Sequence, residues 1–202
     1  ARQYEDYCRA IARPFGMVLI CGPTGSGKST TLYATLRRLN RTSDNILTIE
    51  DPIEYTLEGV NQVQLKEEIG LTFASALRTF LRQDPDIIML GEIRDGPTAQ
   101  MAVRSSLTGH LLFSTIHTNT AWGAVARLAD MGVHPYLVAN TLLMTVAQRL
   151  VRLLCPHCKR EAAVTGEVRR LLPGHAPARY YEPVGCKRCF YTGYSGRRAV
   201  YE

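Results

Sequence analysis

Residues 22–29 read Gly-Pro-Thr-Gly-Ser-Gly-Lys-Ser, which matches the phosphate-binding pattern G-x-x-x-x-G-K-[ST]. The apolar run 17–21 comes directly before this loop and predicts a short buried strand. Residues 28–39 follow with leucines at helical spacing and predict a helix. A strand, a glycine-rich loop and a helix N-terminus aim several backbone N–H groups at one point, which attracts anions. The pattern therefore constrains the chain to an α/β fold with a phosphate site.

The positions of this loop have predicted roles. Lys28 is expected to reach the β- and γ-phosphates of a nucleotide, and the Ser29 hydroxyl is expected to hold Mg²⁺. The alternative is a chance turn rich in glycine and serine, which explains eight matching residues between a strand and a helix poorly. The predicted nucleotide-binding residues are Gly22, Pro23, Thr24, Gly25, Ser26, Gly27, Lys28, Ser29 and Thr30.

Two carboxylates follow or end predicted strands. Residues 86–90 form an apolar run that is followed by Gly91 and Glu92, and Glu50 ends the run 46–50. The carboxyl ends of parallel strands meet at the edge where α/β sheets bind ligands. Glu92 is therefore expected to orient and deprotonate a water that attacks the γ-phosphate, and Glu50 is expected to reach the same edge. The alternative is that both acids are solvated and structural, which their shared position beside a phosphate loop disfavours.

Two histidines flank the predicted strand 111–116. His110 and His117 are seven residues apart, so they are expected at opposite ends of the strand and a shared metal is not expected. His117 belongs to the carboxyl end and is the better candidate for contacting phosphate or water. His110 is expected to be structural.

Three arginines are candidates for contacting phosphate. Arg78 and Arg82 are one helical turn apart on the polar face of a predicted helix, and Arg94 follows Glu92 by two positions. Such arginines are usually solvated. In a protein that handles phosphate they can instead neutralise transition-state charge, often in a neighbouring subunit.

Four of the six cysteines form two C-x₂-C pairs, and 27 residues separate the pairs. Paired cysteines on separate turns have the spacing of a tetrahedral zinc site. The alternatives are two disulfides or free thiols. A nucleotide-hydrolysing chain without a signal peptide is expected in a reducing compartment, which favours zinc. The predicted zinc ligands are Cys155, Cys158, Cys186 and Cys189.

The length of 202 residues allows one α/β core with a small appendage. We expect a connector from a missing upstream domain at 1–14, a P-loop ATPase core at 15–150, and a zinc-binding module with the start of a truncated C-terminal segment at 151–202. The chain begins without Met and ends inside a predicted strand, so a fragment of a longer protein is expected. No run approaches the ~20 apolar residues of a membrane span, which favours a soluble protein.

The net charge of +6 is unevenly distributed. Residues 1–148 contain 13 Lys and Arg against 14 Asp and Glu, whereas residues 149–202 contain 11 against 4. A basic surface of this kind is typical of partners such as anionic lipid, nucleic acid or an acidic protein. A solvated, arginine-rich surface is the alternative.

Strands that alternate with helices predict a parallel sheet covered by helices on both faces. A weakly alternating run at 60–65 predicts an edge strand, Thr72 is expected to cap a helix, and Pro97 is expected in the first turn of another. Two further helices are predicted at roughly 120–131 and 135–150. The expected fold is a RecA-like P-loop NTPase with a small zinc-binding module.

Taken together, these motifs resemble those of the secretion-superfamily ATPases, the type II secretion and type IV pilus assembly ATPases. The phosphate loop with residues 30–33 is similar to that family's Walker A motif, 48–55 to its Asp box, 84–95 to its Walker B motif and 108–119 to its His box. The cysteine pairs with residues 192–197 resemble its tetracysteine zinc module. The resemblance covers nearly the whole chain, and four such boxes in order are highly specific.

The resemblance implies a function beyond what the residues themselves indicate. Family members are cytoplasmic homohexamers that bind ATP, Mg²⁺ and, through the tetracysteine module, Zn²⁺. They bind the cytoplasmic face of an inner-membrane platform protein, and they use ATP hydrolysis to push pilin subunits into a filament. The zinc pairs favour secretion or pilus extension, because the retraction ATPases of the superfamily lack them. By this analogy Glu92 is the main catalytic acid, Glu50 assists, and Arg78, Arg82 and Arg94 engage phosphate directly or across the subunit interface.

Two other classes of protein are compatible with the sequence. A DNA translocase or helicase with a zinc ribbon would use the basic C-terminal region, but that region lacks the aromatic interleaving of a base-stacking surface. A nucleotide-binding assembly module without turnover would use the phosphate loop as a structural site.

Overall fold

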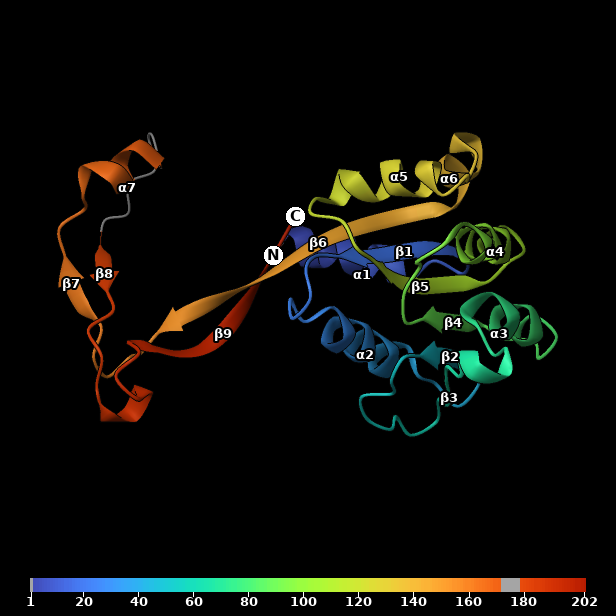
Figure 1. Cartoon of the computed structure of the whole chain (residues 1–202), viewed down its shortest axis with the longest axis horizontal. Helices are drawn as coiled ribbons and strands as arrows, with labels where there is room; N and C mark the ends of the chain where they lie inside the picture. The colour runs from blue at the N-terminus through green and yellow to red at the C-terminus, as the bar shows by residue number, and fades with distance from the viewer. Residues whose placement is uncertain (1, 172–178) are drawn as a thin grey trace. The chain divides into compact units, whose positions relative to one another are not determined.

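The computed structural model describes residues 2–171 and 179–202 (Figure 1). They form two compact units. The core unit contains the residues up to Arg149 together with Tyr201–Glu202, and the cysteine unit contains Leu150–Val200.

The chain forms a seven-stranded sheet in the order β3-β2-β4-β5-β1-β6-β9, and its first five strands in this order lie wholly in the core unit. The pairings of β1 with β5 and β6, of β2 with β3 and β4, and of β4 with β5 are all parallel. Ala147 on β6 exchanges both backbone hydrogen bonds with Glu202, at 3.1 and 2.9 Å. The strands are β1 Gly16–Cys21, β2 Ile46–Glu50, β3 Asn61–Gln64, β4 Ile87–Leu90, β5 Leu111–Ile116, β6 Leu142–Leu154 and β9 Tyr194–Tyr201.

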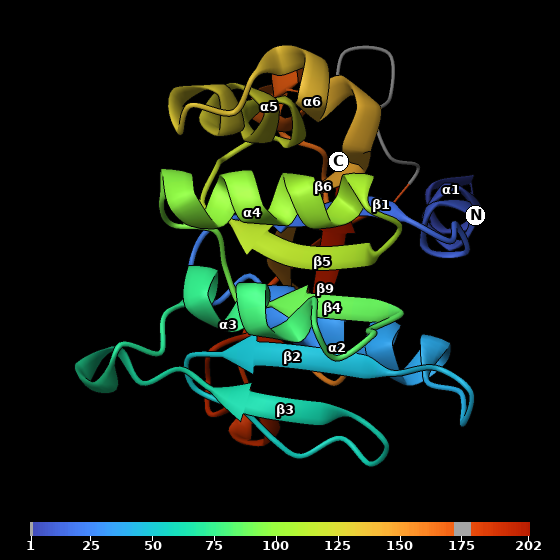
Figure 2. The same ribbon diagram turned by 90° about the vertical axis from the view of Figure 1, so that its right-hand side faces the viewer.

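Helices cover both faces of this sheet because its strands are apolar on both sides. On β1, Met17 and Leu19 pack into one hydrophobic cluster, and Val18 and Ile20 pack into the other. Figure 2 shows α3 and α4 over the near face of the sheet, with α2 behind it. One face is covered by α3 Phe73–Phe80, α4 Gly96–Leu107, α5 Ala121–Asp130 and α6 Pro135–Thr141, and the other by α1 Arg2–Ile11 and α2 Lys28–Leu39. The predicted α/β fold is confirmed.

Local signals in the sequence define several element ends. The Thr72 side chain accepts a hydrogen bond from the Ser75 N–H, as predicted for the cap of α3, and Pro97 lies in the first turn of α4. Asp95 caps α4 by accepting from the Thr98 N–H at 2.7 Å. The predicted edge strand is β3, which is the first strand in the sheet order, and the short 3₁₀ helix Glu67–Ile69 follows it.

The helix predicted at 135–150 is wrong in its second half. Helix α6 ends at Thr141, and strand β6 begins at Leu142. Residues 142–147 are mostly apolar, and such a short run has no periodicity that separates a strand from a buried helix. The free edge of β1 decides the outcome, because its backbone groups need partners and β6 supplies them in a parallel pairing.

Apart from the end of β6 and most of β9, the described residues of the cysteine unit form only short elements. Strands β7 Arg160–Ala162 and β8 Tyr180–Glu182 pair antiparallel, and Arg160 Nε donates to Glu182 Oε1 at 3.0 Å across them. Helix α7 spans Gly166–Leu171, and a 3₁₀ helix spans Lys187–Cys189.

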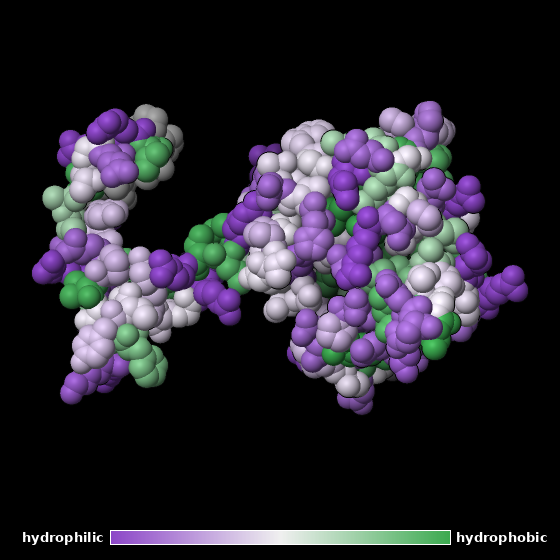
Figure 3. Space-filling view, in the orientation of Figure 1, coloured by the Kyte–Doolittle hydropathy of each residue, from purple (hydrophilic) through white to green (hydrophobic). Residues whose placement is uncertain are grey.

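On the face of the core unit drawn in Figure 3, hydrophilic residues are spread over the surface, with hydrophobic patches between them. This is expected for a sheet whose apolar faces are covered by amphipathic helices. Within the described part of the chain, no helix has the length and apolar character that crossing a membrane requires.

Candidate nucleotide site and metal centre

The phosphate loop joins β1 to α2, and its backbone requires glycine at its start. Gly22 has a φ of 144°, and a Cβ on it would lie 2.4 Å from the Gln148 carbonyl oxygen and 2.8 Å from Ser26 Oγ. Gly27, with a φ of 85°, directly precedes the first residue of α2. The loop therefore packs tightly against β6, and the helix N-terminus begins where the loop ends.

Lys28 extends back over this loop. Its Nζ donates to the carbonyl oxygens of Gly22 at 3.0 Å and Pro23 at 3.1 Å. Burial lowers the pKa of Lys28, and the charge of Glu92 opposes that shift. Ser29 and Thr30 are exposed on the first turn of α2. An ammonium group and two hydroxyls thus surround the helix N-terminus, which is a donor set that suits a phosphate with a bound Mg²⁺.

Glu92 lies at the centre of a charged cluster at the carboxyl edge of the sheet. Its carboxylate pairs with Arg94, and its Oε2 lies 3.2 Å from His117 Nε2. Arg94 also contacts Asp51 at 3.2 Å, and the hydrogen bond to Glu92 raises the pKa of Arg94. Residues that follow β2, β4 and β5 thus meet in one charged cluster, and the charge of Glu92 also acts on Lys28.

Glu50 has a different environment from Glu92. It is 3% exposed, and its carboxylate accepts hydrogen bonds from Tyr33 Oη, from Thr48 Oγ1 at 2.6 Å and from Gln62 Nε2 at 3.0 Å. Burial and the hydrogen bond to Glu50 raise the pKa of Tyr33 to about 12. Glu50 is therefore a buried carboxylate whose charge is satisfied by three donors.

The remaining candidate side chains lie outside the Glu92 cluster. Arg78 lies in the last turn of α3, whereas Arg82 lies two residues after its end, so the prediction of one shared helical face is wrong for Arg82. Both arginines are exposed. His110 precedes β5, and its Nδ1 lies 3.0 Å from the Ser105 carbonyl oxygen, while His117 follows the strand. The two histidines lie at opposite ends of β5, as predicted.

The four paired cysteines converge in the cysteine unit. Their Sγ atoms all lie within 4.8 Å of one another, and all four are free thiols. Burial alone would raise the pKa of Cys189, but N–H groups of Cys186 and Gly193 donate to its Sγ at 3.2 and 3.3 Å, and its pKa is lowered to about 6. Four convergent sulfurs with backbone donors fit a tetrahedral Zn²⁺ site. His157 is not part of the cluster and lies 3.1 Å from Arg188 instead.

The sequence missed several residues that hold the site together. Tyr33 and Gln62 bind Glu50, and Asp51 binds Arg94. Gln148 hydrogen-bonds the phosphate loop, and Arg149 Nη2 donates to the Asn119 carbonyl oxygen at 2.8 Å. For Asp51 a signal was present, because it directly follows Glu50 at the end of a predicted strand. Gln148 and Arg149 had no signal, because their segment was predicted to be helical.

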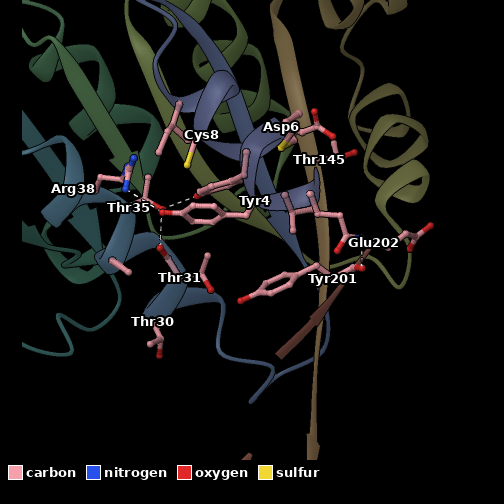
Figure 4. Close-up of a pocket in the computed structure, with 16 residues that line it drawn as sticks. Tyr4, Asp6, Cys8, Thr30, Thr31, Thr35, Arg38, Thr145, Tyr201 and Glu202 are labelled. Carbon is pink, nitrogen blue, oxygen red and sulfur yellow. Dashed lines mark hydrogen bonds between the residues drawn. The ribbon is translucent and has the colours of Figure 1, made fainter. Parts of the chain in front are cut away.

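A cavity of about 760 Å³ adjoins the first turn of α2 (Figure 4). Thr30 and Thr31 line one part of it, and Tyr4 on α1 lines another. Arg38 Nη1 donates to Tyr4 Oη at 3.1 Å on the same wall. The cavity is lined by both aromatic and hydroxyl side chains, and it begins directly beside the phosphate loop.

Comparison with known proteins gives consistent matches. The model of the family described as Type II/IV secretion system protein matches residues 1–202. Type II secretion system protein E of Klebsiella pneumoniae is 56% identical over 195 residues, covering 95% of this chain and 39% of that protein. The type IV pilus assembly ATPase PilB of Myxococcus xanthus is 54% identical over 198 residues, covering 96% of this chain and 35% of that protein. The chain therefore spans less than half of the length of these curated relatives.

Among solved structures, the pilus retraction motor PilT with bound ADP is similar in fold. The TM-score is 0.68 at 40% sequence identity, and the match covers 73% of this chain and 46% of that one.

Proposed function

The chain belongs to the Type II/IV secretion system protein family, and we propose that it is the ATPase motor region of a longer protein that drives assembly of pilin or pseudopilin filaments. The observation that carries the proposal is the phosphate loop with Glu92 at the carboxyl edge of the same sheet. The matches to type II secretion protein E and to a type IV pilus assembly ATPase support it. Residues 15–150 would be the ATPase core and 151–202 the zinc-binding module.

Glu92 is the proposed general base. It is half-buried, and its contacts with Arg94 and His117 hold the carboxylate in one orientation. An ionised carboxylate at this edge can take a proton from a water that attacks the γ-phosphate. Lys28 would bind the β- and γ-phosphates, and Ser29 would hold Mg²⁺, which would neutralise charge on the phosphates. Glu50 would assist as a positioning group, because its oxygens are already occupied by donors.

The nucleoside would occupy the cavity beside α2. Thr30 and Thr31 line that cavity and directly follow the loop that would bind the phosphates. A nucleotide with its phosphates on the loop therefore has space for its ribose and base between α1 and α2.

The arginines outside the Glu92 cluster fit a role between subunits. Arg78 and Arg82 are exposed, and an exposed guanidinium can reach a nucleotide held by a second copy of the chain. We propose a homohexamer in the longer protein, in the cytoplasm and peripheral at the inner membrane.

The cysteine unit is proposed to bind one zinc and to dock on the membrane platform protein or on the anionic membrane surface. It is basic, with 10 Lys and Arg against 3 Glu over residues 150–200. The side chains of Phe190 and Tyr191 are 87% and 69% exposed beside Lys187 and Arg188. Exposed aromatic and basic residues together suit an acidic protein or lipid surface.

The test of the proposed function is the affinity for MgATP of Lys28→Ala. Removal of a charge-assisted phosphate contact should weaken binding by about 1.5–3 kcal/mol. Lys66→Ala is the matched control, because Lys66 is exposed and outside the site. Titration with a fluorescent ATP analogue measures the effect, and an unchanged affinity in Lys28→Ala would refute the phosphate-loop assignment.

A zinc-ribbon DNA translocase is the competing function, because the cysteine unit has a net charge of +7. Binding to single- and double-stranded DNA over a range of salt concentrations separates the two functions. A DNA-binding protein loses affinity steeply as salt rises. We expect no specific DNA binding at physiological salt.

A further inference from the structure

Strand β6 carries a side chain that binds the phosphate loop from behind. Gln148 is 2% exposed, and its Nε2 donates to the Ser26 carbonyl oxygen at 2.7 Å. Its Oε1 accepts from Thr31 Oγ1 at 2.8 Å. One amide therefore links the middle of the loop to the first turn of α2.

The Ser26 carbonyl oxygen requires a hydrogen-bond donor from outside the loop. A phosphate loop binds anions by pointing backbone N–H groups inward, so its carbonyl groups must point away and find donors elsewhere. A trans peptide is planar, with its C=O and N–H on opposite sides. Fixing the Ser26 carbonyl on Gln148 therefore aims the N–H of Gly27 in the opposite direction.

The side chain of Ser26 does not provide an alternative anchor. Among the buried side-chain oxygens and nitrogens that the structure describes, Ser26 Oγ is the one without a hydrogen-bond partner. The backbone of Gln148 is also close, because its carbonyl oxygen would lie 2.4 Å from a Cβ on Gly22. Both the entry and the middle of the loop are thus packed against the same residue of β6.

We propose that Gln148 is a positioning residue for the phosphate loop, which sets the direction of the loop's N–H groups before a nucleotide binds. The inference rests on the proposed nucleotide-binding function and deepens it. Only an amide of this length can donate to Ser26 and accept from Thr31 at once. A carboxylate cannot donate to a carbonyl, and it would add negative charge beside the phosphates.

The first test compares the MgATP affinity of Gln148→Leu with that of the unchanged chain, by titration with a fluorescent ATP analogue. Loss of the donor leaves the Ser26 carbonyl unpaired, and affinity should fall about tenfold. Gln148→Glu should lose at least as much MgATP affinity as Gln148→Leu. Gln83→Leu is the matched control, because Gln83 is exposed at the far end of the sheet from the loop and should bind as tightly as the unchanged chain.

The second test uses Thr31→Val, which removes the hydrogen bond from Thr31 to Gln148 and leaves the residues of β6 unchanged. Affinity should fall about threefold. Thr31 also lines the cavity beside α2, so the part of its effect that acts through Gln148 is read from the double variant, which should lose less affinity than the sum of the two single losses. If the two substitutions weakened binding independently, through separate losses of stability, their effects on MgATP affinity would add. The affinity of the double variant therefore separates positioning from a structural role.

The outcomes distinguish this inference from the function on which it rests. Affinity within twofold of the unchanged chain in Gln148→Leu, while Lys28→Ala binds weakly, overturns the role of Gln148 alone. Unchanged affinity in both variants overturns the proposed function. If Gln148→Leu does not fold, Thr31→Val decides, and unchanged affinity there overturns the inference.

Discussion

The core unit and the cysteine unit of this chain are stabilised by different means. The core unit buries two hydrophobic clusters, one on each face of its sheet. In the described residues of the cysteine unit, the buried hydrophobic side chains are those of Cys155 and Cys189. Burial of apolar side chains can stabilise the first unit, whereas the second buries few such groups apart from its cysteines.

The two units also differ in net charge. The core unit contains 14 Lys and Arg against 15 Asp and Glu, and Arg94 and His117 contact Glu92 at the candidate site. The cysteine unit has 10 Lys and Arg against 3 Glu, and most of these side chains are exposed. Four thiolates with one Zn²⁺ would add −2, so this unit would stay strongly basic. This difference in charge supports the proposal that the core unit carries the chemistry and the cysteine unit the attachment.

The largest expected effect on the difference between the two units comes from removal of the zinc ligands. Structural zinc supplies about 10–16 kcal/mol of binding free energy that is also folding free energy. Cys155→Ser or Cys186→Ser should therefore release zinc and expose the cysteine unit to protease, while the core unit stays resistant. Limited proteolysis with mass spectrometry and elemental analysis measure both effects, and Cys8→Ser should keep its zinc. Zinc-free protein purified without chelator, or a disulfide between the pairs, would contradict the prediction.

The second prediction separates attachment from chemistry in cells. A variant without zinc should lose filament assembly, while the isolated protein keeps most of its ATP hydrolysis rate. The reason is that Glu92 and the phosphate loop belong to the core unit. If both activities fall together in protein that remains folded, the cysteine unit belongs to the motor.

The third prediction concerns the two acids of the core unit. Glu92→Gln keeps the shape and loses the base, so hydrolysis should fall by at least ~100-fold while ATP remains bound. Glu50→Gln should lower the hydrolysis rate less, because the Glu50 carboxylate is buried and already accepts three hydrogen bonds. Glu68→Gln is an exposed control. Steady-state hydrolysis rates and ATP titrations test the ranking, and a larger loss for Glu50→Gln would reverse it.

The smallest expected effect is a pH dependence of the core unit. The pKa of Tyr33 is raised to about 12, above its ordinary value of 10, so the folded state holds the proton more tightly. The stability that this contributes is present below about pH 10 and is lost as the pH rises towards 12. Tyr33→Phe should melt at a lower temperature than the unchanged chain near neutral pH, with a gap that narrows from pH 10 to 12. Thermal melting measures the gap, and Tyr136→Phe, at an exposed position on α6, should show no such narrowing.

The parts of the site that were predicted are those with local signals. The phosphate loop is contiguous, and the strand that precedes Glu92 is apolar throughout, so neighbouring residues specify both. The C-x₂-C spacing brings each cysteine pair together on one turn. Glu50 shows the limit of this reasoning. Its place at a strand end was predicted, but its burial against Tyr33 and Gln62 depends on residues far away in the chain.

The sequence by itself determined the parallel α/β sheet, the loop, the acid at its edge and the tetracysteine cluster. The sheet, the loop, the acid and each cysteine pair follow from short-range periodicity or spacing, whereas the meeting of the two pairs, 27 residues apart, was predicted from the ligand spacing of zinc sites. Only the tertiary structure decided that residues 142–154 form a strand. That choice depends on the open edge of β1, and it brings Gln148 to within hydrogen-bond distance of Ser26, which lies 122 residues earlier. Hydrogen-bond partners at such separations are set by which strands pair in the sheet, and no local pattern records them.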